Sequence, residues 1–288
     1  MSVPEQAAAE IPAAPEPDQV PAGVDPTTPS PARLYDYYLG GTTNFEADRQ
    51  AGERLRESLP ELADAAWANR GFHGRAAVWM TEELGIRQFL DIGPGLPTQN
   101  NTHQAVHRVS PDARIVYVDI DPLIAAYSQQ LLDGDGTTTL ITADLRDTDA
   151  VLAHPELRRM IDFSQPVGVL MTAVMHFIED AADPWGMVAR YMSAMPSGSY
   201  LALSHATFDK LPPRAVQTID DIYKNATSRI WLRSRKDIER FFSGLEMIPP
   251  YAGASPGLTF VGSWGAEDPE QADSDGSRVL CCAVARRP

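Results

Sequence analysis

The sequence FLDIGPGLPT at residues 89–98 joins a short apolar strand to a turn that contains two glycines. Gly93 and Gly95 let the backbone turn tightly after the strand, and they let a ligand approach the main chain closely. Pro97 is placed to begin a helix directly after the turn. This stretch therefore predicts a strand, a turn and a helix, with a ligand site at the turn.

Apolar strands alternate with helices from Arg87 onward. We expect strands at Gln88–Ile92, Arg114–Val118, Thr138–Thr142, Pro166–Thr172 and Ser199–Ser204, and helices at Thr98–Val109, Pro122–Leu132 and Pro184–Ala194. Helical crossovers imply a parallel sheet that is covered on both faces. Leu258–Trp264 and Arg278–Ala285 are β runs joined by an acidic loop without a helix, so they predict a hairpin and an antiparallel last strand. The predicted fold class is α/β, with a doubly wound, mostly parallel seven-stranded sheet of the Rossmann-like type.

The chain before the first strand differs in composition. We divide the protein into a disordered tail of residues 1–29, a helical cap of residues 30–85 and a sheet domain of residues 86–288. The first 31 residues hold eight prolines, five acidic residues and no lysine or arginine, a composition that cannot bury enough apolar surface to fold. In the cap, Ser30 can cap a helix that begins at Pro31 and ends at Gly40-Gly41, and two further helices are expected at 45–59 and 62–84.

The composition excludes several classes of function. A net charge of −15 over 288 residues argues against a general nucleic-acid binder or an acidic-membrane binder. No stretch approaches the roughly 18 apolar residues that a membrane span needs, and the N-terminus lacks the features of a secretory signal. Cys281 and Cys282 are adjacent in an apolar run, so we expect core residues rather than a disulfide framework or a metal site, in a cytoplasmic protein.

Acidic residues stand at the carboxyl ends of three successive strands, at Asp91, Asp119 and Asp144. A carboxylate at the end of the second strand can accept both ribose hydroxyls of a nucleoside. Asp119 fits this role better than Asp121, which directly precedes Pro122 and can simply cap its helix. Asp144 can accept the exocyclic amine of adenine, although loop aspartates often only stabilise their own turn.

A nicotinamide dinucleotide is the competing ligand for such a turn. Its fingerprint needs glycine or alanine where Thr98 stands, and Pro97 has no N–H to donate to a pyrophosphate. In addition, Asp91 suits a ligand with a cationic ammonium group better than it suits a dianionic pyrophosphate. These residues disfavour a nicotinamide-dependent oxidoreductase.

The series of glycines and strand-end carboxylates resembles the class I S-adenosylmethionine-dependent methyltransferases over roughly residues 86–205. A second stretch, YDYYLGGTTNFEADR at residues 35–49, resembles the N-terminal motif of one methyltransferase family that was long catalogued as a domain of unknown function. Three shorter segments are similar to the same family, namely residues 69–72, 203–205 and 262–264. Pro97 departs from the class, which commonly has a third motif glycine there.

The resemblance implies S-adenosylmethionine as the cofactor. The residues expected to contact it at the strand ends are Asp91, Gly93, Gly95, Asp119, Ile120, Asp144, Leu145 and Ala173. In the cap, Gly41, Asn44 and Arg70 are expected to close over the methionine end and donate to its carboxylate. The alternatives are an ordinary helix stop at Gly40-Gly41 and an ordinary helix-surface role for Arg70.

His176 and His205 follow the fourth and fifth strands, where a general base would stand. Either imidazole can take a proton from an acceptor, but either can also bond a backbone group or form a wall of the cofactor site. The segment Thr207–Leu232, rich in basic and aromatic residues, is expected to be an amphipathic helix pair; the alternative is a cover over an anionic or aromatic substrate.

These features predict transfer of a methyl group from S-adenosylmethionine to an unidentified small molecule. The alternative function is a cofactor-binding regulatory or accessory protein without turnover, because no complete set for activating a nucleophile is visible. The sequence determines neither the acceptor nor the oligomeric state.

Overall fold

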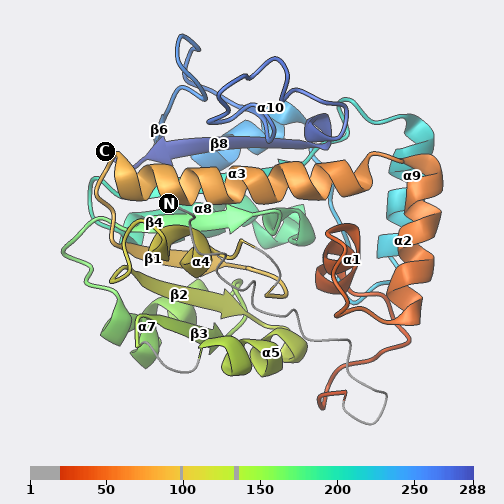
Figure 1. The fold of residues 1–288 in the computed structure, drawn as a ribbon, viewed down its shortest axis with the longest axis horizontal. Helices are drawn as coiled ribbons and strands as arrows, with labels where there is room; N and C mark the ends of the chain where they lie inside the picture. The colour runs from red at the N-terminus through yellow and green to blue at the C-terminus, as the bar shows by residue number, and fades with distance from the viewer. Residues whose placement is uncertain (1–19, 98–99, 133–135) are drawn as a thin grey trace, which may run out of the picture.

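Eight strands form one mixed sheet in the computed structural model, which describes residues 20–97, 100–132 and 136–288 (Figure 1). The strand order is β3-β2-β1-β4-β5-β8-β6, and β7 pairs with β8 beside this path. The strands are β1 Gln88–Ile92, β2 Arg114–Asp119, β3 Thr138–Thr142, β4 Gly168–Thr172, β5 Tyr200–Ala206, β6 Glu246–Met247, β7 Thr259–Phe260 and β8 Leu280–Arg286. Strands β1 to β5 pair in parallel, and β8 is antiparallel to β5. The doubly wound, mostly parallel sheet and its antiparallel last strand are therefore confirmed.

The predicted hairpin forms, but it is short. β7 pairs with β8 only through Thr259 with Cys282 and Phe260 with Cys281. The edge beside β8 is taken in part by β6, a two-residue strand that the sequence analysis did not predict. The additional strand β6 gives a sheet of eight strands instead of the expected seven.

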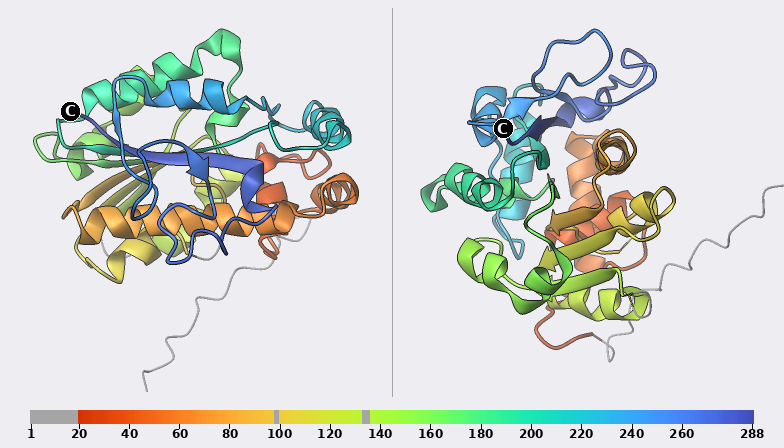
Figure 2. Two further views of the ribbon diagram at one scale, coloured as in Figure 1. Left: turned by 90° about the horizontal axis from the view of Figure 1, so that it is seen from above. Right: turned by 90° about the vertical axis from the view of Figure 1, so that its left-hand side faces the viewer.

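Helices cover both faces of this sheet (Figure 2). They are α1 Pro31–Tyr38, α2 Glu46–Ser58, α3 Leu62–Glu82, α4 Thr102–His107, α5 Pro122–Leu132, α6 Thr148–Ala153, α7 Pro155–Met160, α8 Pro184–Ala194, α9 Pro213–Tyr223 and α10 Arg235–Glu239. α3 packs on one face, and α8 and α10 pack on the other. None of the helices within the described ranges is both long enough and apolar enough to cross a membrane.

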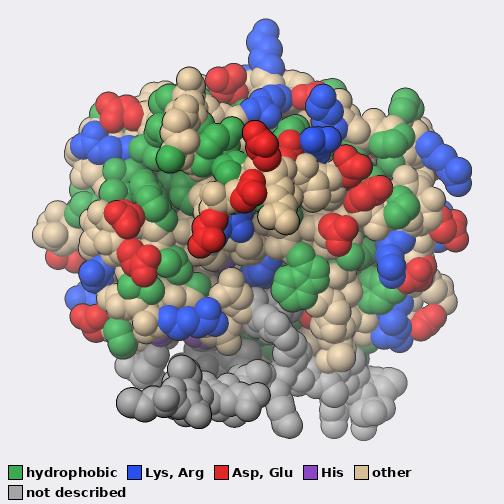
Figure 3. Space-filling model, turned by 45° about the horizontal axis from the view of Figure 1, so that its top comes forward, with side chains coloured by type: hydrophobic (Ala, Val, Ile, Leu, Met, Phe, Trp, Pro, Cys, Tyr) green, Lys and Arg blue, Asp and Glu red, His purple; other side chains and the backbone are tan. Residues whose placement is uncertain are grey.

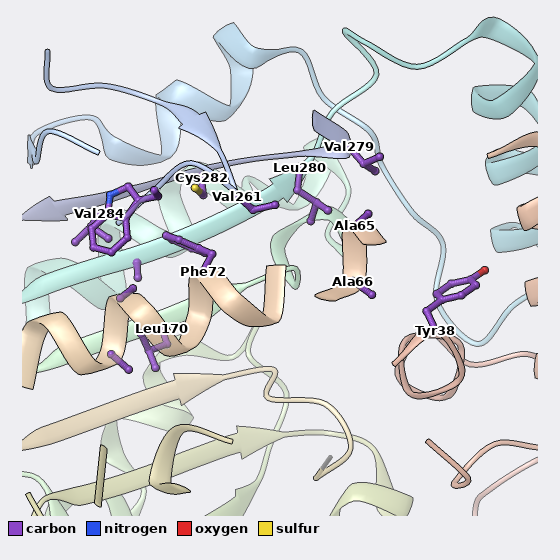
Figure 4. Close-up of a cluster of buried hydrophobic side chains, with 14 of the residues drawn as sticks. Tyr38, Ala65, Ala66, Phe72, Leu170, Val261, Val279, Leu280, Cys282 and Val284 are labelled. Atoms are coloured by element: carbon purple, nitrogen blue, oxygen red, sulfur yellow. The ribbon is translucent and has the colours of Figure 1, made fainter. Parts of the chain in front are cut away.

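Alternation of side chains along each strand divides the core into two layers. Phe89 faces the layer under α3, whereas its neighbour Leu90 faces the layer under α8. The adjacent cysteines follow the same rule, because buried Cys282 joins the first layer (Figure 4) and buried Cys281 joins the second. Both are core residues, as the apolar run predicted. Apolar residues on both faces explain why the strands read as continuous apolar runs.

The cap helices α1 and α2, together with α9, lie beyond the carboxyl ends of the parallel strands (Figure 1). Buried Asp48 holds the cap together, because its carboxylate accepts from the backbone N–H of Ser30 at 2.9 Å, from Arg33 Nε at 2.7 Å and from the N–H of Phe45 at 2.8 Å. Ser30 stands at the predicted N-cap position before Pro31, but its side chain makes no cap bond. The cap therefore places α1 and α2 at the edge of the sheet where ligands collect.

Residues 20–29, which we expected within a disordered tail, contact the cap. The backbone carbonyls of Asp25 and Thr28 accept from Arg33 Nη2 at 3.1 and 2.5 Å, and the Pro29 carbonyl accepts from the N–H of Thr227 at 2.8 Å. Val24 packs against an apolar cluster that includes Leu123. The boundary at residue 29 is therefore placed too late, and the remaining tail, residues 1–19, lies outside the described residues.

Two further elements differ from the sequence prediction. α4 begins at Thr102 with Asn101 at its N-cap, so Pro97 does not begin it. Thr98, the expected first residue of that helix, lies outside the described part of the chain. The segment from residue 207 to 232 contains one helix, α9, instead of a pair, and turns and loop make up the rest.

Candidate functional site

A cavity of about 700 Å³ lies at the carboxyl ends of the parallel strands, enclosed by the cap, the loop after β4 and α9. This volume is typical of a small-molecule site, for which about 300–1,000 Å³ is usual. Nine of the predicted site residues line it: Arg70, Gly93, Gly95, Asp119, Ile120, Asp144, Leu145, Ala173 and His176. Four do not line it: Asp91, Gly41, Asn44 and His205.

The glycine turn forms the floor of the cavity. Gly93 and Gly95 have φ angles of +70° and +71°, a region that favours glycine because it has no Cβ. A Cβ at Gly93 would lie 2.3 Å from a methyl carbon of Val174, so a larger residue would displace the loop after β4. A Cβ at Gly95 would instead meet no atom of a described residue within 4 Å. The backbone at Gly95 is therefore accessible to a ligand.

Asp119 at the end of β2 is positioned by backbone amides. Its carboxylate accepts from the N–H of Gly95 at 3.4 Å and from the N–H of Asp121 at 3.0 Å. Burial raises the pKa of Asp119 to about 6, and the nearby charge of Asp121 adds to this effect. Asp121 accepts from the N–H of Leu123 at 2.8 Å and so caps α5, as expected for the residue before Pro122. Asp119 is thus the carboxylate that remains for a ligand in the cavity.

Asp144 lines the cavity but is already engaged. Arg146 donates from Nε and Nη2 to both carboxylate oxygens at 2.6–2.9 Å, and its backbone N–H also donates to Asp144 Oδ1 at 2.9 Å. The Arg146 side chain accordingly lowers the pKa of Asp144. Asp144 stabilises its own turn, which was the alternative to an adenine contact; each oxygen retains a further lone pair for a ligand.

Asp91 lies behind the cavity wall in a buried network with His73. Thr102 Oγ1 donates to Asp91 Oδ2 at 2.6 Å and lies 2.7 Å from His73 Nε2, while His73 Nδ1 lies 2.9 Å from Thr172 Oγ1. Because the Thr102 proton goes to Asp91, His73 Nε2 must donate to Thr102 and Nδ1 must accept from Thr172. Burial lowers the pKa of His73 to about 3 and raises that of Asp91 to about 7. Asp91 Oδ1 has no hydrogen-bond partner among the residues that the structure describes.

Arg70 on α3 has no polar partner among the described residues. Its side chain is 6% exposed and lines the cavity, and its Nε is buried without an acceptor. Its guanidinium lies over the face of the Tyr35 ring, 5.4 Å from the ring centre, and its charge acts on the buried Asp91 carboxyl without a hydrogen bond to it. A buried guanidinium without a hydrogen-bonded anion is costly, so this geometry indicates a place for a ligand carboxylate.

A chain of hydrogen bonds joins the cap to the sheet beside Arg70. Tyr35 accepts from Asn69 Nδ2 at 3.0 Å, and Asn69 Oδ1 accepts from Ser204 Oγ at 2.5 Å. Ser204 Oγ in turn accepts from the N–H of Ala173 at 2.9 Å. Ala173 has a φ of +54°, which is strained for a residue with a Cβ and is held by these bonds. The network fixes the strained turn after β4 in the cavity wall.

Gly41 and Asn44 make contacts within the cap and do not line the cavity. This corrects the expectation that both contact the cofactor. Asn44 Nδ2 donates to Asp36 Oδ2 at 2.8 Å and to the Gly41 carbonyl at 2.9 Å. A Cβ at Gly41 would lie 2.0 Å from Asp36 Oδ1, so the buried carboxylate requires glycine there. The polar residues of this motif therefore shape the loop between α1 and α2.

The two histidines also differ from the expected general bases. His205 is fully buried; its Nδ1 donates to the Ala206 carbonyl at 2.7 Å, and its Nε2 accepts from Arg233 at 2.7 Å. Both nitrogens are used, so His205 has a structural role. His176 lines the cavity, but its Nδ1 accepts from the N–H of Ala206 at 3.2 Å, which leaves the proton on Nε2. Burial lowers the pKa of His176 to about 3, so His176 can donate a hydrogen bond but has no free nitrogen for a proton.

A family model described as S-adenosyl methyltransferase matches residues 17–288. The chain belongs to the S-adenosyl methyltransferase family. A DUF574 family protein from Streptomyces avermitilis MA-4680 is 37% identical to it, with a TM-score of 0.83, over 91% of this chain and 98% of that one. A candidate methyltransferase from Thermobifida fusca YX is 36% identical, with a TM-score of 0.84, over 93% of this chain and 98% of that one. None of the curated proteins matches the chain.

S-adenosylmethionine is the cofactor of this methyltransferase, and the residues present fit it. The guanidinium of Arg70, which has no hydrogen-bond acceptor among the described residues, matches the carboxylate of the methionine end. Asp91 lies behind the wall and does not line the cavity, so its contact with the ammonium group stays a prediction. Asp119 and the open backbone at Gly95 fit a ribose and its neighbouring atoms. The cavity therefore offers complementary groups for a zwitterionic nucleoside.

Two residues of α3 line the cavity although they were not among the predicted site residues. Asn69 and His73 line the cavity together with Arg70. His73 stands three residues after Arg70 and four after Asn69 on a helix that is otherwise largely apolar, so it lies on the same face as both. This spacing of polar residues is a signal that could have identified His73 from the sequence.

Proposed function

We propose that this protein transfers the methyl group of S-adenosylmethionine to a small-molecule acceptor that binds in the same cavity. Membership of the methyltransferase family supports S-adenosylmethionine-dependent methylation. The observation that carries the proposal is the buried, unpartnered Arg70 beside a turn of open glycine backbone. A buried guanidinium at that place supports binding of the carboxylate at the cofactor's methionine end. This binding mode puts the sulfonium inside the cavity.

The protein's own residues bind and orient in this proposal. Arg70 grips the carboxylate, Asp119 accepts the ribose hydroxyls, and Asp144 with Leu145 flanks the adenine. Cap residues Tyr35 and Asn69 exclude water on the opposite side. When bound, the cofactor supplies a methyl group on a sulfonium sulfur, which an acceptor lone pair takes while the sulfur keeps the C–S bonding electrons. The N-terminal motif YDYYLGGTTNFEADR then acts as the framework of the cap that closes the site.

In this mechanism, alignment of the acceptor with the methyl group lowers the activation free energy, and no residue removes a proton from the acceptor beforehand. His176 offers Nε2–H as a hydrogen-bond donor but has no nitrogen lone pair left to take a proton. His73, the other described imidazole of the cavity wall, forms hydrogen bonds at both nitrogens. Proximity and orientation to an activated methyl group can by themselves account for several kcal/mol, up to about 7–11 kcal/mol in well-oriented systems. An acceptor whose proton is lost after transfer therefore fits the site.

The test is turnover with methyl-labelled S-adenosylmethionine and a fractionated small-molecule extract. We expect S-adenosylhomocysteine and a labelled product of low molecular mass, and we expect neither with Asp119→Ala at the same cofactor concentration. Cofactor binding without product in any fraction would instead support the alternative function, a regulatory or accessory protein. No binding of either cofactor form would contradict both.

A further inference from the structure

The part of the cavity that the cap and α9 line is apolar, and we call it the cap chamber. Its walls are Tyr38, Leu55, Ile219, Tyr223, Leu232 and Leu280. All six belong to or pack against one apolar cluster, although they come from α1, α2, α9, β8 and a loop. Figure 4 shows two of these walls, with Tyr38 on α1 and Leu280 beside Ala65 at the start of α3. The chamber is therefore an apolar space that distant segments enclose jointly.

One polar atom of the chamber lacks a partner among the described residues. Tyr38 is 8% exposed, and its buried hydroxyl makes no hydrogen bond to any residue that the structure describes. Burying a hydroxyl without a partner is unfavourable, so such a group in a cavity wall indicates a ligand atom that pairs with it. The adjacent Tyr37 provides a contrast, because its hydroxyl bonds to Glu53 and it does not line the cavity.

The charged residues near the chamber are paired or exposed. Arg33 is paired with Asp48, and Asp25, which keeps its charge while it accepts from the hydroxyls of Thr27 and Thr28, is exposed to solvent. Arg229 at the cavity rim is exposed and pairs with Asp220. The face of the molecule in Figure 3 likewise mixes acidic and basic side chains. Among the described residues of the cavity wall, the one buried cation without an anion is Arg70, which the cofactor uses in the proposed function.

The chamber also presents aromatic rings. Tyr38 and Tyr223 contribute to its walls, and Phe177, which lines the same cavity, lies with its ring centre 6.1 Å from that of Tyr223. Aromatic side chains favour flat aromatic partners in offset or edge-on arrangements. A planar ring system would therefore fill this space better than a flexible chain.

We propose, on the basis of the proposed function, that the cap chamber binds the methyl acceptor and that the acceptor is an uncharged, mainly apolar aromatic molecule with one polar atom on the Tyr38 hydroxyl. An ionised acceptor would lose its hydration in the chamber and find no opposite charge there. A neutral one loses little hydration and satisfies the hydroxyl that the protein leaves unpaired.

The experiment measures binding of four naphthalene probes by calorimetry, with the protein saturated with S-adenosylhomocysteine. The probes are 2-naphthol, naphthalene, 2-naphthoate and 2-naphthylmethylammonium. We expect 2-naphthol to bind at least about tenfold more tightly than either ion, because the ions lose hydration without a partner. Tyr38→Phe should weaken 2-naphthol binding about three- to tenfold, the usual effect of one neutral hydrogen bond, and should leave naphthalene binding unchanged. Tyr37→Phe is the matched control and should change neither.

A second variant locates the probe independently of Tyr38. Ile219→Trp fills the chamber from α9, a helix that carries none of the proposed cofactor residues, so it should abolish 2-naphthol binding and preserve the affinity for S-adenosylhomocysteine. Ions that bind as tightly as 2-naphthol, an unchanged affinity in Tyr38→Phe, or retained binding in Ile219→Trp would each overturn this inference and leave the proposed function intact. Failure of the wild-type protein to bind S-adenosylhomocysteine would overturn the proposed function instead.

Discussion

The His73 imidazole and the Asp91 carboxylate lie 3.7 Å apart, both almost completely buried, with the Thr102 hydroxyl bonded to each. Despite this proximity they do not form an ion pair at neutral pH, because burial lowers the pKa of His73 to about 3. The hydrogen bonds instead run in one direction, from Thr172 through His73 and Thr102 to Asp91. The network thus supplies one donor to Asp91 Oδ2 and leaves Oδ1 without a partner among the described residues.

Asp91→Asn should stabilise the protein without cofactor at pH 8. The folded protein holds the Asp91 proton up to about pH 7, whereas the ordinary carboxyl releases it near 3.8. The folded state therefore binds more protons between these values, and stability falls as the pH rises through them. We expect the variant to melt at least about 2 °C higher than wild type at pH 8 and at a similar temperature near pH 4.

The control for this prediction is Asp221→Asn. Asp221 is exposed, and its hydrogen bond to Lys224 lowers its pKa, so its loss should give no gain at pH 8. Asp91→Asn should also weaken cofactor binding, because an amide cannot offer the ammonium a negative charge. A lower melting temperature at pH 8 would contradict the buried charge at Asp91.

Asp119→Ala should weaken S-adenosylhomocysteine binding by roughly 1.5–3 kcal/mol, because it removes a charged acceptor of two hydroxyls. Calorimetry measures this loss, and Asp121→Ala, which removes only the cap of α5, is the comparison. In the wild-type protein, affinity should decline below about pH 6, where the Asp119 carboxyl takes up its proton. If Asp119→Ala kept the wild-type affinity for S-adenosylhomocysteine and Asp121→Ala lost affinity, the ribose contact would have to be assigned to Asp121.

Arg70→Lys should weaken cofactor binding although it conserves the charge. A guanidinium grips a carboxylate through two parallel bonds, which an ammonium cannot do, so a loss on the order of 1 kcal/mol is expected. Decarboxylated S-adenosylmethionine should bind the two proteins equally. Arg56→Lys on the exposed side of α2 should behave as wild type. Equal binding of the complete cofactor to Arg70→Lys and wild type would place the carboxylate elsewhere.

Deletion of residues 1–29 should lower the melting temperature, whereas deletion of residues 1–19 should not. The longer deletion removes the backbone carbonyls of Asp25 and Thr28, which leaves Nη2 of the buried Arg33 without these acceptors. The composition of residues 1–19 predicts little stabilising burial. Thermal unfolding of both truncated proteins tests this, and equal melting temperatures would show that residues 20–29 contribute nothing.

Strand ends and the glycine turn could be predicted because they depend on local pattern and on topology. Apolar runs separated by helical crossovers must form parallel strands, and parallel strands end at one edge of the sheet. Gly93, Gly95, Asp119, Asp144 and Ala173 therefore had to come together there, and they do. The same reasoning failed at Pro97 and at residues 207–232, where tertiary contacts override local helix signals.

Only the tertiary structure decided which polar side chains keep a free hydrogen-bonding atom. His205 stands at a strand end as a base would, but Arg233, 28 residues away, occupies its Nε2. Asn44 is held within the cap by Asp36, whereas Arg70 meets no acceptor among the described residues. A residue's place on a strand follows from its neighbours in the chain, but its availability to a ligand depends on partners that only folding brings within hydrogen-bond distance.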